Sequence, residues 1–185
     1  LFATDGYEAT SMRKIAEKVE YSPTAIYLHF KDKDALVHEL CMSDFAQLSA
    51  RAVQVAKVAD PIERLKQLAQ MYVGFALEHP NHYRLMFMTP LPTQNPTEEE
   101  LQRMQDPEED SYAFLLHTVN EAMTAGRFRA ELKDPEMVAQ VLWSAVHGVA
   151  SLHIVKGCEE WIEMRPADEL TEAICDAVLA GLARK

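Results

Sequence analysis

Apolar residues recur at intervals of three and four along nearly the whole chain, and no stretch shows the sustained alternation of a half-buried strand. That spacing places the apolar side chains on one face of an α-helix. Residues that start and stop helices divide the pattern into segments. The sequence therefore predicts an all-α protein of about nine helices with no internal repeat.

Capping residues and prolines set the predicted helix boundaries. The N-terminal part is predicted to hold a helix that ends near Gly6, a short helix from Thr10 or Ser11 to Val19, and a third over 23–30 that Ser22 caps. Further helices are predicted over 33–58, 61–78 and 80–88, then from 97 with an interruption at Pro107, over 111–125, over 135–157 and from 166 or 167 to 182. Three prolines mark residues 89–96 as a loop.

Composition agrees with an ordinary globular protein. The 185 residues are 48% hydrophobic and 25% charged, which excludes general disorder and fibrous repeats. The three cysteines, at 41, 158 and 175, form neither a CxxC pair nor an even set, so no disulfide framework or zinc knuckle is predicted. No secretory signal is visible. We therefore expect a cytoplasmic protein without a metal or other cofactor.

The chain as a whole is acidic, with 18 basic and 29 acidic side chains and a formal net charge of −11. Such a charge by itself argues against a nucleic-acid partner. Residues 12–33 are the exception, because they carry five basic and three acidic side chains, a net charge of +2. A nucleic-acid site is therefore to be sought in this basic segment.

Residues 137–155 contain no acidic or basic side chain and nearly have the length needed to span a bilayer. Two histidines, two serines and a glutamine are spread through this run, and its flanks are not positively biased. We expect a helix buried on most of its sides and no membrane partner.

The two short helices before residue 31 are joined by a tight turn, and each is too small to bury its apolar face alone. This is the arrangement of a helix-turn-helix DNA reader, in which the second helix enters the major groove. A small core is expected from Ile15, Ala16, Val19, Ile26 and Phe30. The outer side of the second helix is expected to present Thr24, Ala25, Tyr27 and Leu28.

Residues 6–16 and 21–36 resemble the N-terminal domain of tetracycline-repressor-family (TetR family) transcriptional regulators. The specific part is the Tyr-x-His-Phe-x-x-Lys run that begins at Tyr27 and leads to Leu36. The resemblance implies a helix-turn-helix domain over 1–40 and a helical effector-binding and dimerisation domain over 41–185. It implies a non-enzymatic repressor that binds a palindromic operator as a homodimer and is released by a small ligand.

By this resemblance Arg13, Thr24, Tyr27, His29 and Lys33 fall where the family contacts operator DNA. Tyrosine, histidine and lysine side chains suit phosphate oxygens, whereas the small Thr24 and Ala25 can approach base edges. One residue departs from the family pattern: Glu20 stands in the turn where a glycine is usual. A side chain in a left-handed turn costs about 1 kcal/mol.

The last two predicted helices offer a dimer interface. The uncharged helix has apolar residues on two sides, so it can pack on its own core and on a partner, although a monomeric interior helix has the same pattern. Residues expected at the interface are Val138, Leu142, Ala145, Val149, Leu152, Leu170, Ile174 and Val178.

Trp143, His147 and Gly148 resemble a Trp-x-x-x-His-Gly element of one C-terminal subgroup of the family. Trp143 and His147 are equally consistent with the wall of a pocket and with an ordinary hydrophobic core. A pocket for a lipophilic effector is expected under the helix over 33–58, with the 89–96 loop near its mouth. Its walls are predicted to be Tyr72, Phe75, Phe114, His117, Trp143 and His147.

Two alternatives to a regulator remain at this point: a helical small-molecule-binding module, or an enzyme in which the helix-turn-helix is only scaffold. Against an enzyme, the chain contains no phosphate-binding loop, dinucleotide turn, serine elbow or zinc-protease helix. His79 and His82 flank Pro80 and have no third paired ligand, so they do not predict a metal site.

Overall fold

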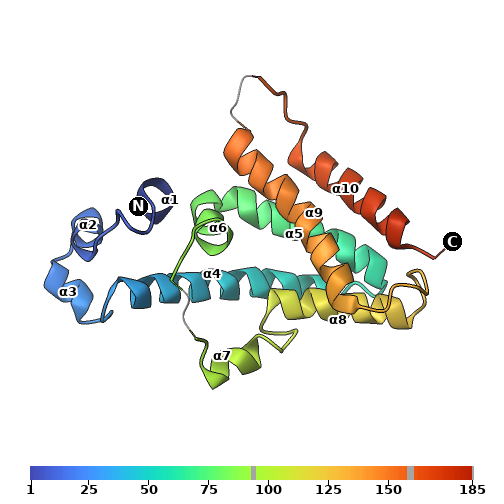
Figure 1. Ribbon diagram of the computed structural model, residues 1–185, viewed down its shortest axis with the longest axis horizontal. Helices are drawn as coiled ribbons and strands as arrows, with labels where there is room; N and C mark the ends of the chain where they lie inside the picture. The colour runs from blue at the N-terminus through green and yellow to red at the C-terminus, as the bar shows by residue number, and fades with distance from the viewer. Residues whose placement is uncertain (93–94, 158–160, 185) are drawn as a thin grey trace. The chain divides into compact units, whose positions relative to one another are not determined.

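The computed structural model describes residues 1–92, 95–157 and 161–184. These residues form ten α-helices and one isolated β-bridge, between Phe128 and Ala183, which confirms the all-α prediction (Figure 1). Part of the predicted 89–96 loop, namely residues 93 and 94, and one of the three cysteines, Cys158, lie outside the described residues.

The helix bounds follow the predicted ones closely. They are α1 Phe2–Asp5, α2 Met12–Lys18, α3 Pro23–Tyr27, α4 Lys33–Val55, α5 Pro61–Glu78, α6 Pro80–Phe87, α7 Glu98–Arg103, α8 Ser111–Thr124, α9 Pro135–Lys156 and α10 Ala167–Leu182. The segment around Pro107 separates α7 from α8. The largest differences are at helix ends: α3 ends at Tyr27 instead of Phe30, α4 at Val55 instead of near Val58, and α7 at Arg103, before the interruption predicted at Pro107.

Side-chain caps explain why these helices begin where they do. The hydroxyl of Ser11 accepts a hydrogen bond from the Lys14 amide, and that of Ser22 accepts one from the Ala25 amide. Asp60 accepts from the amide of Glu63, and Thr97 forms a reciprocal capping box with Glu100. Each cap satisfies an amide that the first helical turn leaves without an intrahelical partner.

One compact unit comprises Leu1–Gln47 and His79–Pro96, and so contains α1, α2, α3 and α6 together with most of α4. Its core holds Phe2, Tyr7, Met12, Ile15, Leu36, Val37, Cys41 and Leu85, with Ile26, Phe30, Phe45 and Leu91 packed against it. The expected core position of Val19 is wrong: this side chain is 47% exposed, because α2 ends at Lys18 and Val19 leaves the helical conformation.

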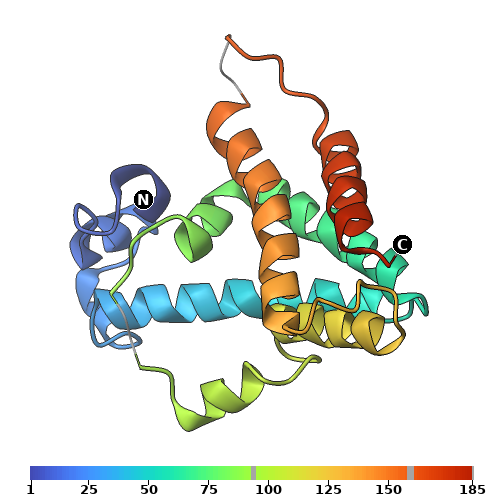
Figure 2. The ribbon, with the colours of Figure 1, turned by 45° about the vertical axis from the view of Figure 1, so that its right-hand side comes forward.

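The second compact unit comprises Leu48–Glu78 and Thr97–Lys185. Within it α5 packs against α8, α9 and α10, and α9 also packs against α8 and α10. Both ribbon views show α9 and α10 side by side (Figures 1 and 2). The interior is apolar except for groups such as Arg64, whose guanidinium pairs with Glu121 and donates to the Val58 carbonyl at 2.8 Å.

Helix α9 is the one helix among the described residues that is long and apolar enough to cross a membrane. Length and composition alone support that possibility, and the core helix of a soluble protein passes the same test. Several of its side chains, including Val138, Ala139 and Leu142, are buried against neighbouring helices.

Glu20 adopts the left-handed conformation that its place in the turn predicted, with φ of 60°. The turn after α2 is closed by two backbone bonds: the Tyr21 amide donates to the Ala16 carbonyl at 2.9 Å, and the Glu20 amide donates to the Glu17 carbonyl at 3.4 Å. This is the pattern of a Schellman helix end, which normally has glycine at the position of Glu20. The turn is thus formed in spite of its side chain.

Replacing Glu20 by glycine is therefore expected to raise the free energy of unfolding by about 1 kcal/mol, because glycine removes the steric penalty of the left-handed region. Urea denaturation followed by circular dichroism measures this change. Glu20→Gln is the matched control, since it loses the same charge and keeps the strain. Equal stabilities of the two variants would show that the turn is unstrained.

Candidate DNA-binding and ligand-binding sites

Helix α3 stands at the surface of the first unit, with one side held and the other side open. Ile26 is half-buried against the core, whereas Thr24, Tyr27 and His29 are exposed. Tyr27 is 53% exposed, and Leu28 at 80% presents even more of its surface. Ala25 is half-buried at the edge of this face. The predicted outer side of α3 therefore faces solvent.

Arg13 is exposed on α2, where its Nε lies 3.2 Å from Oε1 of Glu17 one turn later. Both side chains are largely in solvent, so this ion pair contributes little to stability and breaks easily. Arg13 remains able to reach an external anion.

Lys33 differs from the exposed residues of this surface. It is half-buried at the start of α4, where its Nζ donates to the Tyr7 carbonyl at 2.7 Å and lies 3.9 Å from the centroid of the Tyr7 ring. The Tyr7 hydroxyl in turn donates to Asp34. Sequence reasoning missed Tyr7 and Asp34 because nothing in their spacing indicates a contact across 26 or 27 residues.

Three of the predicted ligand-binding residues meet in the second unit. The Trp143 Nε1 donates to the Tyr72 hydroxyl at 3.0 Å, and that hydroxyl lies 3.2 Å from Nδ1 of His147. Tyr72 is buried, whereas Trp143 and His147 are half-buried. Tyr112, which the sequence did not single out, places its ring 5.8 Å from that of Trp143 and its hydroxyl 2.6 Å from Glu136.

Burial lowers the pKa of His147 from its ordinary value of 6.5, because desolvation disfavours the charged imidazole. The unfolded chain then binds a proton at His147 more readily than the folded one. This histidine consequently favours the folded state above pH 6.5 and loses that contribution as the pH falls below it. At neutral pH it is an uncharged hydrogen-bonding group next to Tyr72.

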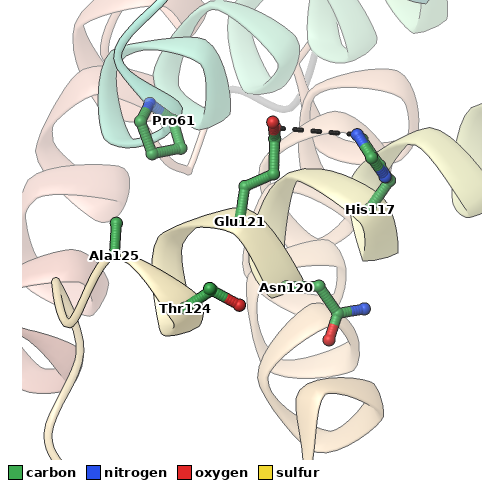
Figure 3. Close-up of a pocket in the computed structure, with 6 residues that line it drawn as sticks. All are labelled: Pro61, His117, Asn120, Glu121, Thr124 and Ala125. Carbon is green, nitrogen blue, oxygen red and sulfur yellow. Dashed lines mark ion pairs between the residues drawn. The ribbon is translucent and has the colours of Figure 1, made fainter.

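The other three predicted pocket residues have contacts of a different kind. Phe75 is fully buried, with the Arg51 guanidinium 5.3 Å from its ring centroid, and Phe114 packs with Ala52 and Leu68. His117 is exposed and 3.8 Å from Glu121. It lines an open hollow of about 480 Å³ with Pro61, Asn120, Glu121, Thr124 and Ala125 (Figure 3), and none of the other five predicted residues lines this hollow.

The predicted dimer residues also divide into two groups. Val138, Leu142 and Val149 are buried inside the protomer, which corrects the expectation that they face a partner: they fill the core between α9 and its neighbours. Ala145, Leu170, Ile174 and Val178 are half-buried, and Leu152 is 52% exposed. The apolar side chains that α9 does expose are Met137, Val141, Leu152 and Val155.

No group of three potential metal ligands is assembled among the described residues. His82 instead places Nδ1 2.8 Å from the Asp44 carboxylate, and its ring lies 5.8 Å from that of His79.

Comparisons with known proteins identify the family. Residues 1–40 match the family described as "Bacterial regulatory proteins, tetR family", and residues 65–178 match "Tetracyclin repressor-like, C-terminal domain". The chain therefore belongs to the tetracycline-repressor (TetR) family and is a DNA-binding helix-turn-helix transcriptional regulator, in a family that is not enzymatic.

Two relatives are similar to this chain over most of its length. The HTH-type transcriptional repressor KstR2 of Mycobacterium tuberculosis strain H37Rv is 27% identical over 139 residues, which cover 75% of this chain and 68% of that protein. A protein of unknown function from Rhodococcus sp. RHA1 is 26% identical, with a TM-score of 0.75 over 99% of this chain and 90% of the other.

Two further solved structures share the fold. The ketosteroid transcriptional regulator KstR2 of M. tuberculosis has a TM-score of 0.65 at 22% identity, over 100% of this chain and 90% of that one. PfmR, a TetR family transcriptional regulator from Thermus thermophilus, has a TM-score of 0.73 at 22% identity, over 99% of this chain and 94% of the other.

Proposed function

We propose that this regulator is a cytoplasmic repressor that binds a palindromic operator as a homodimer and leaves it when a lipophilic ligand binds. The observation that carries the DNA-binding part is the solvent-facing side of α3, held in place by the core of the first unit. A helix-turn-helix domain of this size contacts only a few base pairs. Selective binding therefore requires two such domains on a DNA site with two-fold symmetry.

Within this proposal each residue of this surface has a contact suited to its chemistry. Thr24 and Ala25, at the N-terminal end of α3, approach base edges in the major groove, where a hydroxyl can bond and a methyl group can meet that of thymine. Tyr27, His29 and Arg13 contact phosphate oxygens and fix the register of the helix-turn-helix domain on the duplex.

Selection of duplexes from a random-sequence library by the unmodified protein tests the operator proposal. The enriched sequences should contain two inverted half-sites whose centres lie about 34–36 Å apart, or a multiple of that distance. Thr24→Val, which removes a hydroxyl and keeps the shape, should change the preferred base at one position of each half-site. Enrichment of a site without inverted symmetry would contradict the two-fold model.

The exposed face of α9 supports the dimer proposal. Met137, Val141, Leu152 and Val155 recur at helical spacing on one side of the helix, with the small Gly148 among them. Apart from the neighbouring residues and backbone of α9 itself, no group of the described residues lies within 4 Å of the position a Gly148 side chain would take, so a partner backbone has room to approach there. Half-buried Leu170, Ile174 and Val178 extend the apolar surface onto α10.

Leu152→Glu is expected to weaken the dimer by about tenfold or more, since it puts an unpaired charge into an apolar interface, while the protomer stays folded because Leu152 is exposed. Analytical ultracentrifugation measures the dissociation constant. Leu101→Glu, at a leucine that is 46% exposed on α7, is the matched control and should leave assembly unchanged. A stable monomer of the unmodified protein at micromolar concentration would contradict the proposal.

The group formed by Tyr72, Trp143 and His147 supports the ligand proposal. It joins two half-buried aromatic rings to a hydroxyl and an imidazole, a combination that can bind an apolar molecule and orient one polar group on it. Trp143 and His147 also carry the proposed subgroup element. Because a similar protein is called a ketosteroid regulator, we take a ketosteroid as the first candidate effector.

Trp143 can report on this site directly. The chain has two tryptophans, and Trp161 is 70% exposed, so Trp161→Phe leaves Trp143 as the sole fluorophore. Titration with a ketosteroid should change the Trp143 emission saturably and release the selected duplex over the same range of ligand concentrations. A ligand shifts the DNA-binding equilibrium only by the difference in its affinity for the DNA-bound and the released protein. Binding without release would contradict the release mechanism, and an unchanged emission would contradict a ketosteroid effector at this site.

A further inference from the structure

Three polar side chains of the second unit form a chain of hydrogen bonds. The Trp143 Nε1 donates to the Tyr72 hydroxyl at 3.0 Å, and the same hydroxyl lies 3.2 Å from Nδ1 of His147. The side chains come from α5 and α9, which pack against each other. The first bond has only one possible direction, because the indole nitrogen is a donor and never an acceptor.

The direction of the second bond follows from the first. The Tyr72 oxygen accepts from Trp143, and a bond accepted at this oxygen polarises the O–H group and makes it a stronger donor. At neutral pH His147 is uncharged, because burial lowers its pKa, and Nδ1 of a neutral imidazole can accept a proton from the phenol. The arrangement in which Tyr72 donates to Nδ1 of His147 is therefore the more stable one.

This direction sets the tautomer of His147. A neutral imidazole carries one ring proton, so a ring that accepts at Nδ1 carries that proton on Nε2. A ligand group that contacts the ring at Nε2 therefore meets a hydrogen-bond donor. Ketone, ester and carboxylate oxygens accept such a bond, whereas an ammonium group only donates and would place two donors against each other.

Neighbouring aromatic contacts hold the chain of hydrogen bonds in place. The rings of Tyr112 and Trp143 pack edge-on with their centroids 5.8 Å apart, and those of Trp143 and His147 do so at 6.1 Å. The Tyr112 hydroxyl donates to Glu136 at 2.6 Å. Burial and this bond raise the pKa of Tyr112, so its hydroxyl remains a protonated donor at neutral pH. The Trp143 indole is thus packed between two rings.

We propose that His147 selects an effector that carries a hydrogen-bond acceptor, such as a ketone or carboxylate oxygen, which bonds to Nε2 of the imidazole. Tyr72 and Trp143 are positioning residues that hold the imidazole in this tautomer. The proposal rests on the ligand-binding part of the proposed function and deepens it, but it requires neither a steroid skeleton nor a particular operator.

The tautomer can be measured without any ligand. Long-range proton–nitrogen correlation spectra of the protein with ¹⁵N-labelled histidine distinguish a protonated ring nitrogen from a bare one. The chain has seven histidines, and His147→Gln identifies the signals of His147 by their loss. At neutral pH we expect a protonated Nε2 and a bare Nδ1. Tyr72→Phe should shift the Nδ1 signal to that of a nitrogen without a hydrogen bond. A protonated Nδ1, or a signal that Tyr72→Phe leaves unchanged, would overturn the proposal.

Matched probes test the choice of ligand on the Trp161→Phe protein, in which Trp143 is the sole tryptophan. A ketosteroid, the aminosteroid with the same skeleton and the parent hydrocarbon differ only in the group that they offer to His147. The ketone should bind about tenfold or more tightly than the other two, because one hydrogen bond contributes about that factor. His147→Leu should abolish this preference. His117→Leu, at an exposed histidine of α8, is the matched control and should keep it.

A second set of probes, a long-chain alkyl ketone with the corresponding amine and alkane, separates this proposal from the steroid. A preference for the ketone in the alkyl set alone would support the proposal and exclude a ketosteroid effector. An amine that binds at least as tightly as the ketone, or a preference that survives His147→Leu, would overturn the proposal. Equal affinity for all three probes would overturn it and leave the ligand site standing, whereas no binding in either set would contradict both.

Discussion

The structure depends on one constraint: a five-residue helix cannot bury enough apolar surface to be stable alone, yet α3 must stay rigid while most of its surface faces solvent. The solution is a shared core. Ile26 and Phe30 pack against side chains from α1, α2, α4 and α6, so elements distant in sequence hold the reading helix. The cost of ordering α3 is offset by apolar surface that other helices contribute.

The same logic explains the contacts around Tyr7. A turn that joins two short helices has carbonyl groups without intrahelical partners, and here side chains of Lys33, Thr10 and Lys14 bond three of them. Basic residues near a nucleic-acid surface can therefore serve the fold as well as the charge. In a protein with a net charge of −11, the basic segment over 12–33 contains two lysines that bond carbonyl groups of this turn, Lys14 and Lys33.

Local signals made most of the fold predictable from the sequence. Caps and prolines act over three or four residues, so the starts of α2, α3 and α9 follow directly from Ser11, Ser22 and Asp134. The left-handed Glu20 was predictable from the resemblance to the family. The exposed face of α3 also agrees with its predicted residues, because a helix of known start has a calculable outer side.

Burial was harder to predict, since it depends on which neighbours a helix meets. Helix α9 is apolar on two sides, and nothing in its periodicity tells which side turns inward, so Val138, Leu142 and Val149 were assigned to a partner and lie in the core. The pocket residues divide for the same reason: Tyr72, Trp143 and His147 meet across two helices, whereas His117 lies on an exposed part of α8.

We propose that the solvent-facing side of α3 binds duplex DNA. Its most direct test is the affinity of the unmodified protein for a DNA duplex over a range of salt concentrations. We expect log affinity to fall linearly with log salt concentration, because binding releases condensed counterions. Each phosphate contact should contribute about 0.9 to the slope, so several contacts should give a steep salt dependence. Absent binding, or an affinity independent of salt, would contradict it.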